Sequence, residues 1–280
     1  MRLVTYSSPA GPRAGVLTEG GLVDAWTLLG EPSRASLREL IAEQRLGELA
    51  AGAAGGAEAV EGAALLAPIP DPEKIVCIGL NYRSHAAEAG LEAPSSPAIF
   101  GKFRNALAAP GATVTLPAAS AKVDYEAEVA FVVGRRARQV GVGQALGHIA
   151  GYTLLNDLSA RDLQFATPQW MAGKVFDGSA PCGPAIVTPE EAGPHDAIEI
   201  SLTLNGETMQ SASTSDLIFP IPELLAHLST LMTLEPGDIV STGTPAGVGS
   251  VRRPRVWLSD GDRVVVSSPT LGELETAIAR

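Results

Sequence analysis

The sequence predicts an α+β protein that is mostly β. Short apolar runs with alternating side chains recur along its 280 residues, and Asn-Gly, Asp-Gly and Pro-Gly pairs separate many of them. Few segments show the three-to-four residue apolar spacing of an amphipathic helix. Since 45% of the residues are hydrophobic, a packed core is expected. We divide the chain into a small N-terminal domain, residues 1–70, and a larger domain, residues 71–280.

Charge and cysteine content exclude several classes of protein. The formal net charge is −11 and there is no block of five or six like charges, which argues against nucleic acid or a membrane as partner. The densest basic cluster, Arg252-Arg253-Pro254-Arg255, is interpreted as a solvated loop. Cys77 and Cys182 lack the spacing of a zinc site, and no signal peptide or membrane span is visible. We therefore expect a cytoplasmic protein with two buried free thiols.

The first 70 residues read as a β-meander followed by a helix. Strands are expected over 2–6, 14–17 and 22–25. Ser36 and Glu39 have the spacing of a capping box, which predicts a helix beginning near Ser36. An Ala/Gly-rich connection over 50–65 and a proline-rich linker over 68–72 follow, and the domain boundary is placed there.

The larger domain begins with a buried strand over 74–80 that leads into residues 81–90. His85 and Glu88 are three residues apart, so they meet on one face if this segment is a helical turn. A carboxylate beside an imidazole raises the basicity of the ring, which suits a general base. A surface His–Glu pair is the alternative.

Asp124-Tyr125-Glu126-Ala127-Glu128 opens the strand on which the domain is centred. Alternation in a strand places Glu126 and Glu128 on one face, roughly 7 Å apart at the backbone. Their burial beside an apolar run requires a compensating cation, and Asp157, at the end of the apolar run 149–155, is the candidate third ligand. An all-carboxylate set suits Mg²⁺ or Mn²⁺, and Ca²⁺ also fits. A solvated strand face is the alternative.

Lys174 lies between apolar neighbours, so its ammonium needs an anionic partner unless the side chain reaches solvent as a snorkelling lysine. Residues 158–164, which include Gln164, are expected to form a short helix or tight loop at the mouth of the site.

The C-terminal part adds a hairpin, a helix and a loop. Strands over 198–204 and 207–210 flank Asn205-Gly206, the preferred pair of a type I′ turn. An amphipathic helix over 224–232 ends before Pro236-Gly237. A strand from Asp238 leads into a Gly/Thr loop whose N–H groups, with the Thr244 hydroxyl, suit a carboxylate. Further strands are expected around 256–258 and 263–266.

Five ordered motifs together resemble the fumarylacetoacetate hydrolase family. They cover about residues 74 to 265 and are Gly79-Leu80-Asn81-Tyr82…His85, Asp124-Tyr125-Glu126-Ala127-Glu128, Gly151-Tyr152-Thr153…Asn156-Asp157-Leu158-Ser159-Ala160-Arg161-Asp162, Gly173-Lys174-Val175-Phe176-Asp177 and Ser241-Thr242-Gly243-Thr244-Pro245-Ala246-Gly247-Val248-Gly249. The resemblance implies a mixed β-roll or sandwich, a small N-terminal β-rich domain and a homodimer.

The same resemblance implies roles for single residues. It makes Glu126, Glu128 and Asp157 metal ligands, His85 with Glu88 the general base and its partner on a mobile lid, and Lys174 the cation at the substrate. Substrate contacts are expected from Thr244, Arg83 and Gln164. The chain departs from the family pattern over 175–178 and 267–272.

The implied activity is divalent-metal-dependent cleavage of a C–C bond in a 2,4-dioxo acid of the acylpyruvate or fumarylpyruvate type, through a pyruvate enolate that the metal stabilises. The partner is then a small-molecule 2-oxo acid. An isomerase or decarboxylase of 2-oxo or 2-hydroxy-diene dicarboxylates in aromatic catabolism is the alternative, because the same enolate serves it. A non-catalytic binding protein is a third interpretation.

Overall fold

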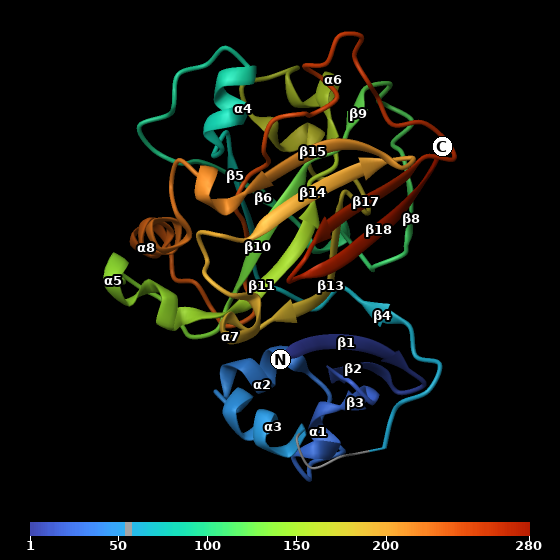
Figure 1. The fold of residues 1–280 in the computed structure, drawn as a ribbon, viewed down its shortest axis with the longest axis vertical. Helices are drawn as coiled ribbons and strands as arrows, with labels where there is room; N and C mark the ends of the chain where they lie inside the picture. Colours follow the sequence, from blue (N-terminus) through green and yellow to red (C-terminus); the bar gives the residue numbers. More distant parts are fainter. Residues whose placement is uncertain (54–57) are drawn as a thin grey trace.

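The computed structural model describes residues 1–53 and 58–280 and shows a mixed, strand-rich architecture (Figure 1). The described strands form a sheet of 11 strands, a sheet of five strands and one separate pair. Part of the predicted connection over 50–65 lies outside the described residues.

The large sheet combines the N-terminal strands with strands from the middle of the chain and β16. Its strands follow in the order β3 (Gly21–Asp24), β2 (Gly11–Thr18), β1 (Arg2–Ser8), β13 (Ala180–Val187), β11 (Ile149–Asn156), β10 (Ala127–Val133), β16 (Ile239–Ser241), β5 (Ile75–Gly79) and β6 (Ala98–Lys102), with β4 (Leu65–Leu66) beside β1 and β7 (Leu107–Ala108) beside β13. Most neighbours are antiparallel, whereas β16 with β5 and β7 with β13 are parallel.

The second sheet contains the predicted hairpin. It runs β15 (Glu207–Ser213), β14 (Glu199–Leu204), β17 (Arg263–Ser268), β18 (Gly272–Ala279) and β8 (Thr113–Thr115), and the separate pair is β12 (Ser159–Ala160) with β9 (Val123–Asp124). Asn205 and Gly206 have φ angles of 52° and 86°. Both values are positive, as a type I′ turn requires, so the turn prediction is confirmed.

The helices are short. They are α1 (Ala25–Leu28), α2 (Leu37–Ala42), α3 (Leu46–Ala53), α4 (Arg83–Glu88), α5 (Val142–Ala145), α6 (Arg161–Gln164), α7 (Pro189–Ala192) and α8 (Ile221–Leu231), with 3₁₀ turns η1 (Arg104–Ala106), η2 (Leu146–His148), η3 (Trp170–Gly173) and η4 (Thr214–Asp216). The Ser36 side chain accepts a hydrogen bond from the Glu39 N–H at 3.2 Å, which confirms the predicted helix start. Among the described residues, no helix has the length and apolar character needed to cross a membrane.

The predicted N-terminal strands are confirmed as β1, β2 and β3. With α1, α2 and α3 they form the lower lobe in Figure 1. This lobe is hydrogen-bonded to the rest, because Arg2 and Leu3 of β1 pair with Val187 and Ile186 of β13. The division into two domains near residue 70 stays a prediction.

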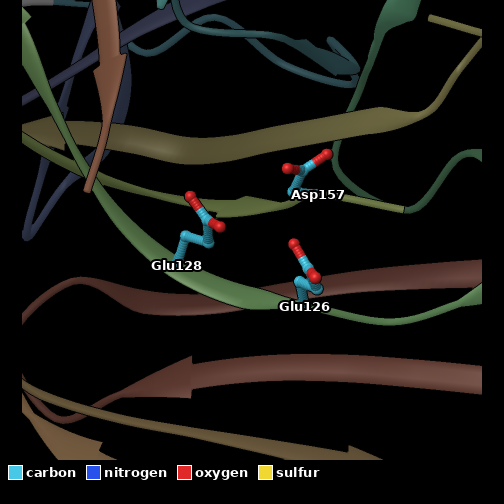
Figure 2. Close-up of side chains that lie close together, drawn as sticks. All are labelled: Glu126, Glu128 and Asp157. Carbon is cyan, nitrogen blue, oxygen red and sulfur yellow. The ribbon is translucent and has the colours of Figure 1, made fainter. Parts of the chain in front are cut away.

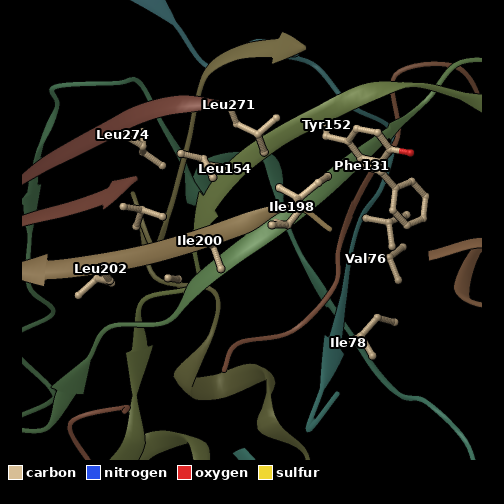
Figure 3. Close-up of a cluster of buried hydrophobic side chains, with 14 of the residues drawn as sticks. Val76, Ile78, Phe131, Tyr152, Leu154, Ile198, Ile200, Leu202, Leu271 and Leu274 are labelled. Carbon is tan, nitrogen blue, oxygen red and sulfur yellow. The ribbon is translucent and has the colours of Figure 1, made fainter. Parts of the chain in front are cut away.

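Two hydrophobic cores cover the faces of the large sheet. Phe131 and Tyr152 belong to the core that also holds Ile200 and Leu274 of the second sheet (Figure 3). The opposite face of β10, which carries Ala130, belongs to a core that also contains residues of the N-terminal lobe. All seven residues of β10 are therefore buried.

The segment around 256–258 is not a strand, contrary to the prediction. The Val256 N–H bonds to the Gly249 carbonyl and the Leu258 N–H to the Val123 carbonyl. Because these bonds go to two different segments, no ladder forms. The expected free thiols are confirmed, since Cys77 and Cys182 are buried and unpaired.

Candidate metal centre and active site

Three carboxyl groups converge where β10 and β11 lie side by side (Figure 2). Glu126 precedes β10 and Glu128 lies within it, whereas Asp157 directly follows β11. Ala127 pairs with Asn156, and the Asp157 N–H donates to the Glu126 carbonyl at 2.9 Å, so the strand register brings the two ends together. Ligand atoms of the three acids lie within 4.8 Å of one another and all three residues are buried. The alternative of a solvated strand face is wrong.

Three buried cations surround these acids. The Lys174 Nζ lies 2.8 Å from Glu126 Oε2 and 2.7 Å from Asp157 Oδ2. The Lys102 Nζ lies 2.8 Å from Asp157 Oδ1, and the Arg161 Nη2 lies 2.6 Å from Glu126 Oε1. Lys174 is 2% exposed, so it is not a snorkelling lysine.

A fourth buried carboxylate, Asp124, completes this charged group. Its Oδ2 accepts from the Arg161 Nε at 2.9 Å, and its oxygens also accept from the N–H groups of Gly249 and Ser250. The group therefore contains four carboxylates and three cations. With all four carboxyl groups ionised, one negative charge would be left unbalanced.

Glu128 is the carboxyl group without a cationic partner among the described residues. It forms no ion pair within the described residues, and its Oε2 accepts only from the Ser241 hydroxyl and, at 3.1 Å, from the Gly243 N–H. Burial, together with the charges of Asp157 and Glu126, raises the pKa of Glu128 well above its usual range. The neutral form of this carboxyl group is therefore favoured.

The pKa of Glu126 moves in the opposite direction. Burial alone would raise it, but the charges of Arg161 and Lys174 outweigh burial and lower the pKa to about 2. Burial likewise opposes the charged form of Lys174, yet Asp157 and Glu126 raise the pKa of its ammonium. These two groups are ionised at neutral pH.

The donor set fits a hard divalent cation. Glu126, Glu128 and Asp157 offer only oxygen atoms, which Mg²⁺, Mn²⁺ and Ca²⁺ prefer, while zinc prefers His or Cys. A divalent cation beside Glu128 would convert the unbalanced negative charge into a single positive charge. The loaded site would then attract an anion.

A cavity of about 490 Å³ opens onto this group. Its wall is mostly apolar, and it includes Glu126, Glu128 and Lys174 along with the predicted residues His85, Gln164 and Thr244. A few polar groups in an apolar cavity are typical of a small-molecule site.

His85 reaches the cavity from α4, which follows β5 and confirms the predicted helical turn. Its side chain is 14% exposed, and its Nδ1 lies 3.6 Å from Glu88 Oε2, beyond hydrogen-bonding distance. The Glu88 carboxylate instead accepts from the Gly247 N–H at 2.9 Å. Glu88 thus links the His85 helix to the predicted Gly/Thr loop.

The expected substrate contacts have different environments. The Thr244 Oγ1 accepts from the Gln210 Nε2 at 2.9 Å, and the Gln164 Oε1 accepts from the Arg161 Nη1 at 3.0 Å. Arg83 does not line the cavity, and its guanidinium donates to a backbone carbonyl at 2.6 Å. The structure brings Thr244 and Gln164 to the site and leaves Arg83 outside it.

Sequence reasoning assigned no role to Asp124, Arg161 or Lys102. The first two lie inside recognised motifs, where a charged residue beside a buried strand is a usable signal. Lys102 ends the alternating segment Ala98–Lys102, and its Nζ also donates to the Ser179 carbonyl at 2.9 Å. A lysine at the end of a buried strand is the available signal, because its ammonium, like that of Lys174, requires an anionic partner.

The chain is similar to known proteins in sequence and in fold. The family model described as "Fumarylacetoacetate (FAA) hydrolase C-terminal" matches residues 74–279. A mitochondrial oxaloacetate tautomerase of Bos taurus is 39% identical over 286 residues, covering 97% of this chain and 90% of that protein.

Solved structures share the whole fold. A putative HpcE protein from Mycobacterium smegmatis superposes with a TM-score of 0.90 at 35% identity, covering 100% of this chain and 99% of the other. The maleylpyruvate hydrolase of Sphingobium sp. SYK-6 has a TM-score of 0.82 at 30% identity, with coverage of 100% and 99%.

Proposed function

The chain belongs to the fumarylacetoacetate hydrolase family, and from that premise we propose that it interconverts the enol and keto forms of a 2-oxo dicarboxylic acid such as oxaloacetate. Members of the family are enzymes that include hydrolases, isomerases and tautomerases. One observation carries the proposal: His85 lines the same cavity as Glu126 and Glu128, two of the three clustered carboxyl residues.

We propose that Glu126, Glu128 and Asp157 hold a divalent cation, Mg²⁺ or Mn²⁺, and that Ca²⁺ also fits. The lack of a cationic partner for Glu128 among the described residues and the all-oxygen donor set support this assignment. When bound, such a cation supplies a Lewis acid for the oxygen atoms of a 2-oxo acid.

The proton transfer is assigned to His85. Ketonisation adds a proton at C3 of the enol and removes one from the oxygen on C2, so a single base that accepts one proton and returns another serves both. Glu88 is hydrogen-bonded to Gly247, and it orients the ring when the 3.6 Å gap to His85 closes.

Substrate binding is assigned to the groups that line the cavity. Lys174 is held by Glu126 and Asp157, and its ammonium stabilises negative charge that develops on the substrate oxygen. Thr244 and Gln164 line the cavity, and their polar side chains are suited to the substrate carboxylate. Arg83 is omitted from this set because it lies outside the cavity wall.

A second candidate is hydrolysis of an acylpyruvate, for which the size of the cavity is the specific observation. A cavity of about 490 Å³ accommodates a ligand larger than a four-carbon acid. For a 2,4-dioxo acid, His85 would activate a water that attacks C4, and cleavage of the C3–C4 bond would give pyruvate and a carboxylic acid. The similarity to a maleylpyruvate hydrolase supports this reading.

One assay separates the two candidates. Decay of the enol absorbance of oxaloacetate is followed with Mg²⁺ or Mn²⁺ present, and acylpyruvates are tested in parallel for release of pyruvate. Faster ketonisation supports the tautomerase; pyruvate release without it supports the hydrolase; the absence of both contradicts the two assignments.

His85→Ala tests the proposed base. It should lower either activity by about 10²–10⁴-fold with nearly unchanged Mn²⁺ affinity. His227→Ala is the matched control, because His227 lies on α8 and outside the cavity wall. Loss of Mn²⁺ binding in the His85 variant would contradict the assignment and make His85 a metal ligand.

A further inference from the structure

The basic cluster over 252–255 is not simply a solvated loop. Arg252 donates to the backbone carbonyls of Gly247 and Met209 at 3.0 and 2.6 Å. Arg253 donates to carbonyls of its own loop. Arg255 has no hydrogen bond or ion pair within the described residues, and it lines the cavity. Of the three arginines, Arg255 alone lines the cavity and lacks a hydrogen-bond partner in the described residues.

Lys122 is a second cation of this kind. It precedes β9, and its backbone carbonyl accepts from the Arg161 N–H at 2.9 Å. The next carbonyl, that of Val123, accepts from the Leu258 N–H at 2.8 Å, so the segment after Arg255 runs beside β9. Lys122 lines the same cavity, is exposed, and forms no side-chain hydrogen bond or ion pair in the part of the chain that the structure describes.

No carboxylate that lines the cavity forms an ion pair with Lys122 or Arg255 in the described residues. Beyond the carboxylates already described, the wall includes Asp162. Its carboxylate accepts from the Ser120 hydroxyl at 2.5 Å and from the N–H groups of Ala121 and Leu163 at 3.1 Å. Asp162 is therefore already hydrogen-bonded, by the segment that precedes Lys122 and by its own helix α6. The two cations therefore face a cavity that offers them no protein partner.

Lys122 lies within a short reach of the carboxyl cluster. Lys122 and Glu126 are four residues apart, so their Cα atoms are separated by at most about 14 Å. The cavity wall also carries apolar side chains such as Phe165 and Trp257. A 2-oxo acid whose head lies at the carboxylate group would direct the other end of its chain toward the two cations.

We propose that Arg255 and Lys122 bind the distal carboxylate of the substrate and so select dicarboxylic over monocarboxylic 2-oxo acids. The inference rests on the proposed function for the position of the substrate head. The guanidinium of Arg255 presents two parallel N–H groups that match a carboxylate, and the Lys122 ammonium adds a second charge-assisted hydrogen bond.

Two substrates that differ only in the distal charge test this selection. The activities of Arg255→Met and Lys122→Met are measured on oxaloacetate and on its 4-methyl ester. The ratio of kcat/KM for the acid to that for the ester should fall about tenfold in Arg255→Met, mainly through KM, and further in the double variant. Arg253→Met is the matched control from the same loop and should retain the wild-type ratio.

Two results would overturn the inference. An equal loss on both substrates would mean that Arg255 acts on the loop and not on the distal carboxylate. An equally large change of the ratio in Arg253→Met would mean that only the general positive field of the loop matters.

A binding measurement separates this inference from the proposed function. Calorimetry compares 2-oxoglutarate with 2-oxopentanoate on the Mn²⁺-loaded protein, without turnover. If wild type prefers 2-oxoglutarate and Arg255→Met does not, the distal site holds even when no ketonisation is seen. If ketonisation is seen and wild type shows no preference, the distal site is wrong and the proposed function stands.

Discussion

Asp24 in the N-terminal lobe and Glu128 in β10 are both buried carboxylates, and their surroundings are opposite. Asp24 accepts from the Tyr6 hydroxyl at 2.6 Å, from the Arg13 Nε at 2.7 Å and from the Thr27 N–H at 2.7 Å. Its charge is matched by one guanidinium. Glu128 accepts from a hydroxyl and an N–H but faces two further carboxylates and no cation of its own.

The pKa values show the same contrast. Burial alone would raise the pKa of Asp24, but the hydrogen bonds from Arg13 and Tyr6 outweigh it and lower the pKa. Burial and Asp24 raise the pKa of Tyr6 to about 12, so its hydroxyl remains a donor. The Asp24 ion pair is satisfied within the protein, whereas Glu128 has no ion pair among the described residues, as expected for a functional site.

The largest effect is expected when the Glu128 carboxyl group is replaced by a neutral amide. Glu128→Gln should weaken Mn²⁺ binding by more than about 100-fold, because loss of a ligand exceeds the 10–100-fold cost of losing an outer partner. The metal-free variant should be no less stable than wild type, since the repulsion from Glu126 and Asp157 is relieved. Calorimetry and thermal unfolding in a chelator measure both, and unchanged Mn²⁺ affinity would contradict the metal assignment.

Lys174→Met deletes the cation shared by Glu126 and Asp157 while keeping its apolar stem. We expect kcat to fall at least about 10²-fold, about 2.7 kcal/mol, because the ammonium stabilises charge that develops during the reaction. The metal-free variant should also unfold more readily, and saturating Mn²⁺ should restore much of that loss. Unchanged kcat in folded protein would assign Lys174 a purely structural role.

Lys102→Met tests a buried cation that does not line the cavity. Its Nζ holds Asp157 Oδ1 at 2.8 Å and the Ser179 hydroxyl at 3.0 Å. Loss of this partner should lower Mn²⁺ affinity about 10–100-fold and the free energy of unfolding by about 3 kcal/mol. Metal titration and chemical denaturation measure the two effects. Wild-type Mn²⁺ affinity would mean that Asp157 needs no support from Lys102.

Asp24→Asn is the matched change in the N-terminal lobe, where Asp24 is paired with Arg13 and Tyr6. It leaves the Arg13 guanidinium without its anionic partner and should destabilise the protein by about 2 kcal/mol. Mn²⁺ affinity and activity of the folded variant should match wild type, because the cluster lies in the N-terminal lobe. A loss of Mn²⁺ affinity would show that the two clusters are coupled.

The smallest expected effect is a pH dependence of that destabilisation. The pKa of Asp24 is lower in the folded protein than in the unfolded chain, so its stabilising contribution is present above an unfolded pKa of about 3.9 and is lost as the pH falls through the folded pKa. The difference in unfolding free energy between wild type and Asp24→Asn should be constant above about pH 5 and shrink below about pH 4. A difference that persists at pH 2.5 would argue against this ion pair as its source.

Much of the fold was predictable because its signals are local. The Asn205-Gly206 pair identifies the β14–β15 turn, and Ser36 identifies the start of α2. The alternation of Val129 and Phe131 identifies β10. By contrast, β8 and β18 pair in parallel across more than half of the chain, and residues 256–258 bond to two separate segments, so no local pattern describes them.

The sequence by itself determined the family, the strand-rich fold and the candidate acids Glu126, Glu128 and Asp157, because these depend on residue type and order. Only the tertiary structure decided how the charges are shared. Lys102 meets Asp157, and Arg255 remains unpaired at the cavity, through contacts between segments distant in sequence. The energy of a charged side chain depends on which groups surround it and on how much water they exclude, and chain order records neither.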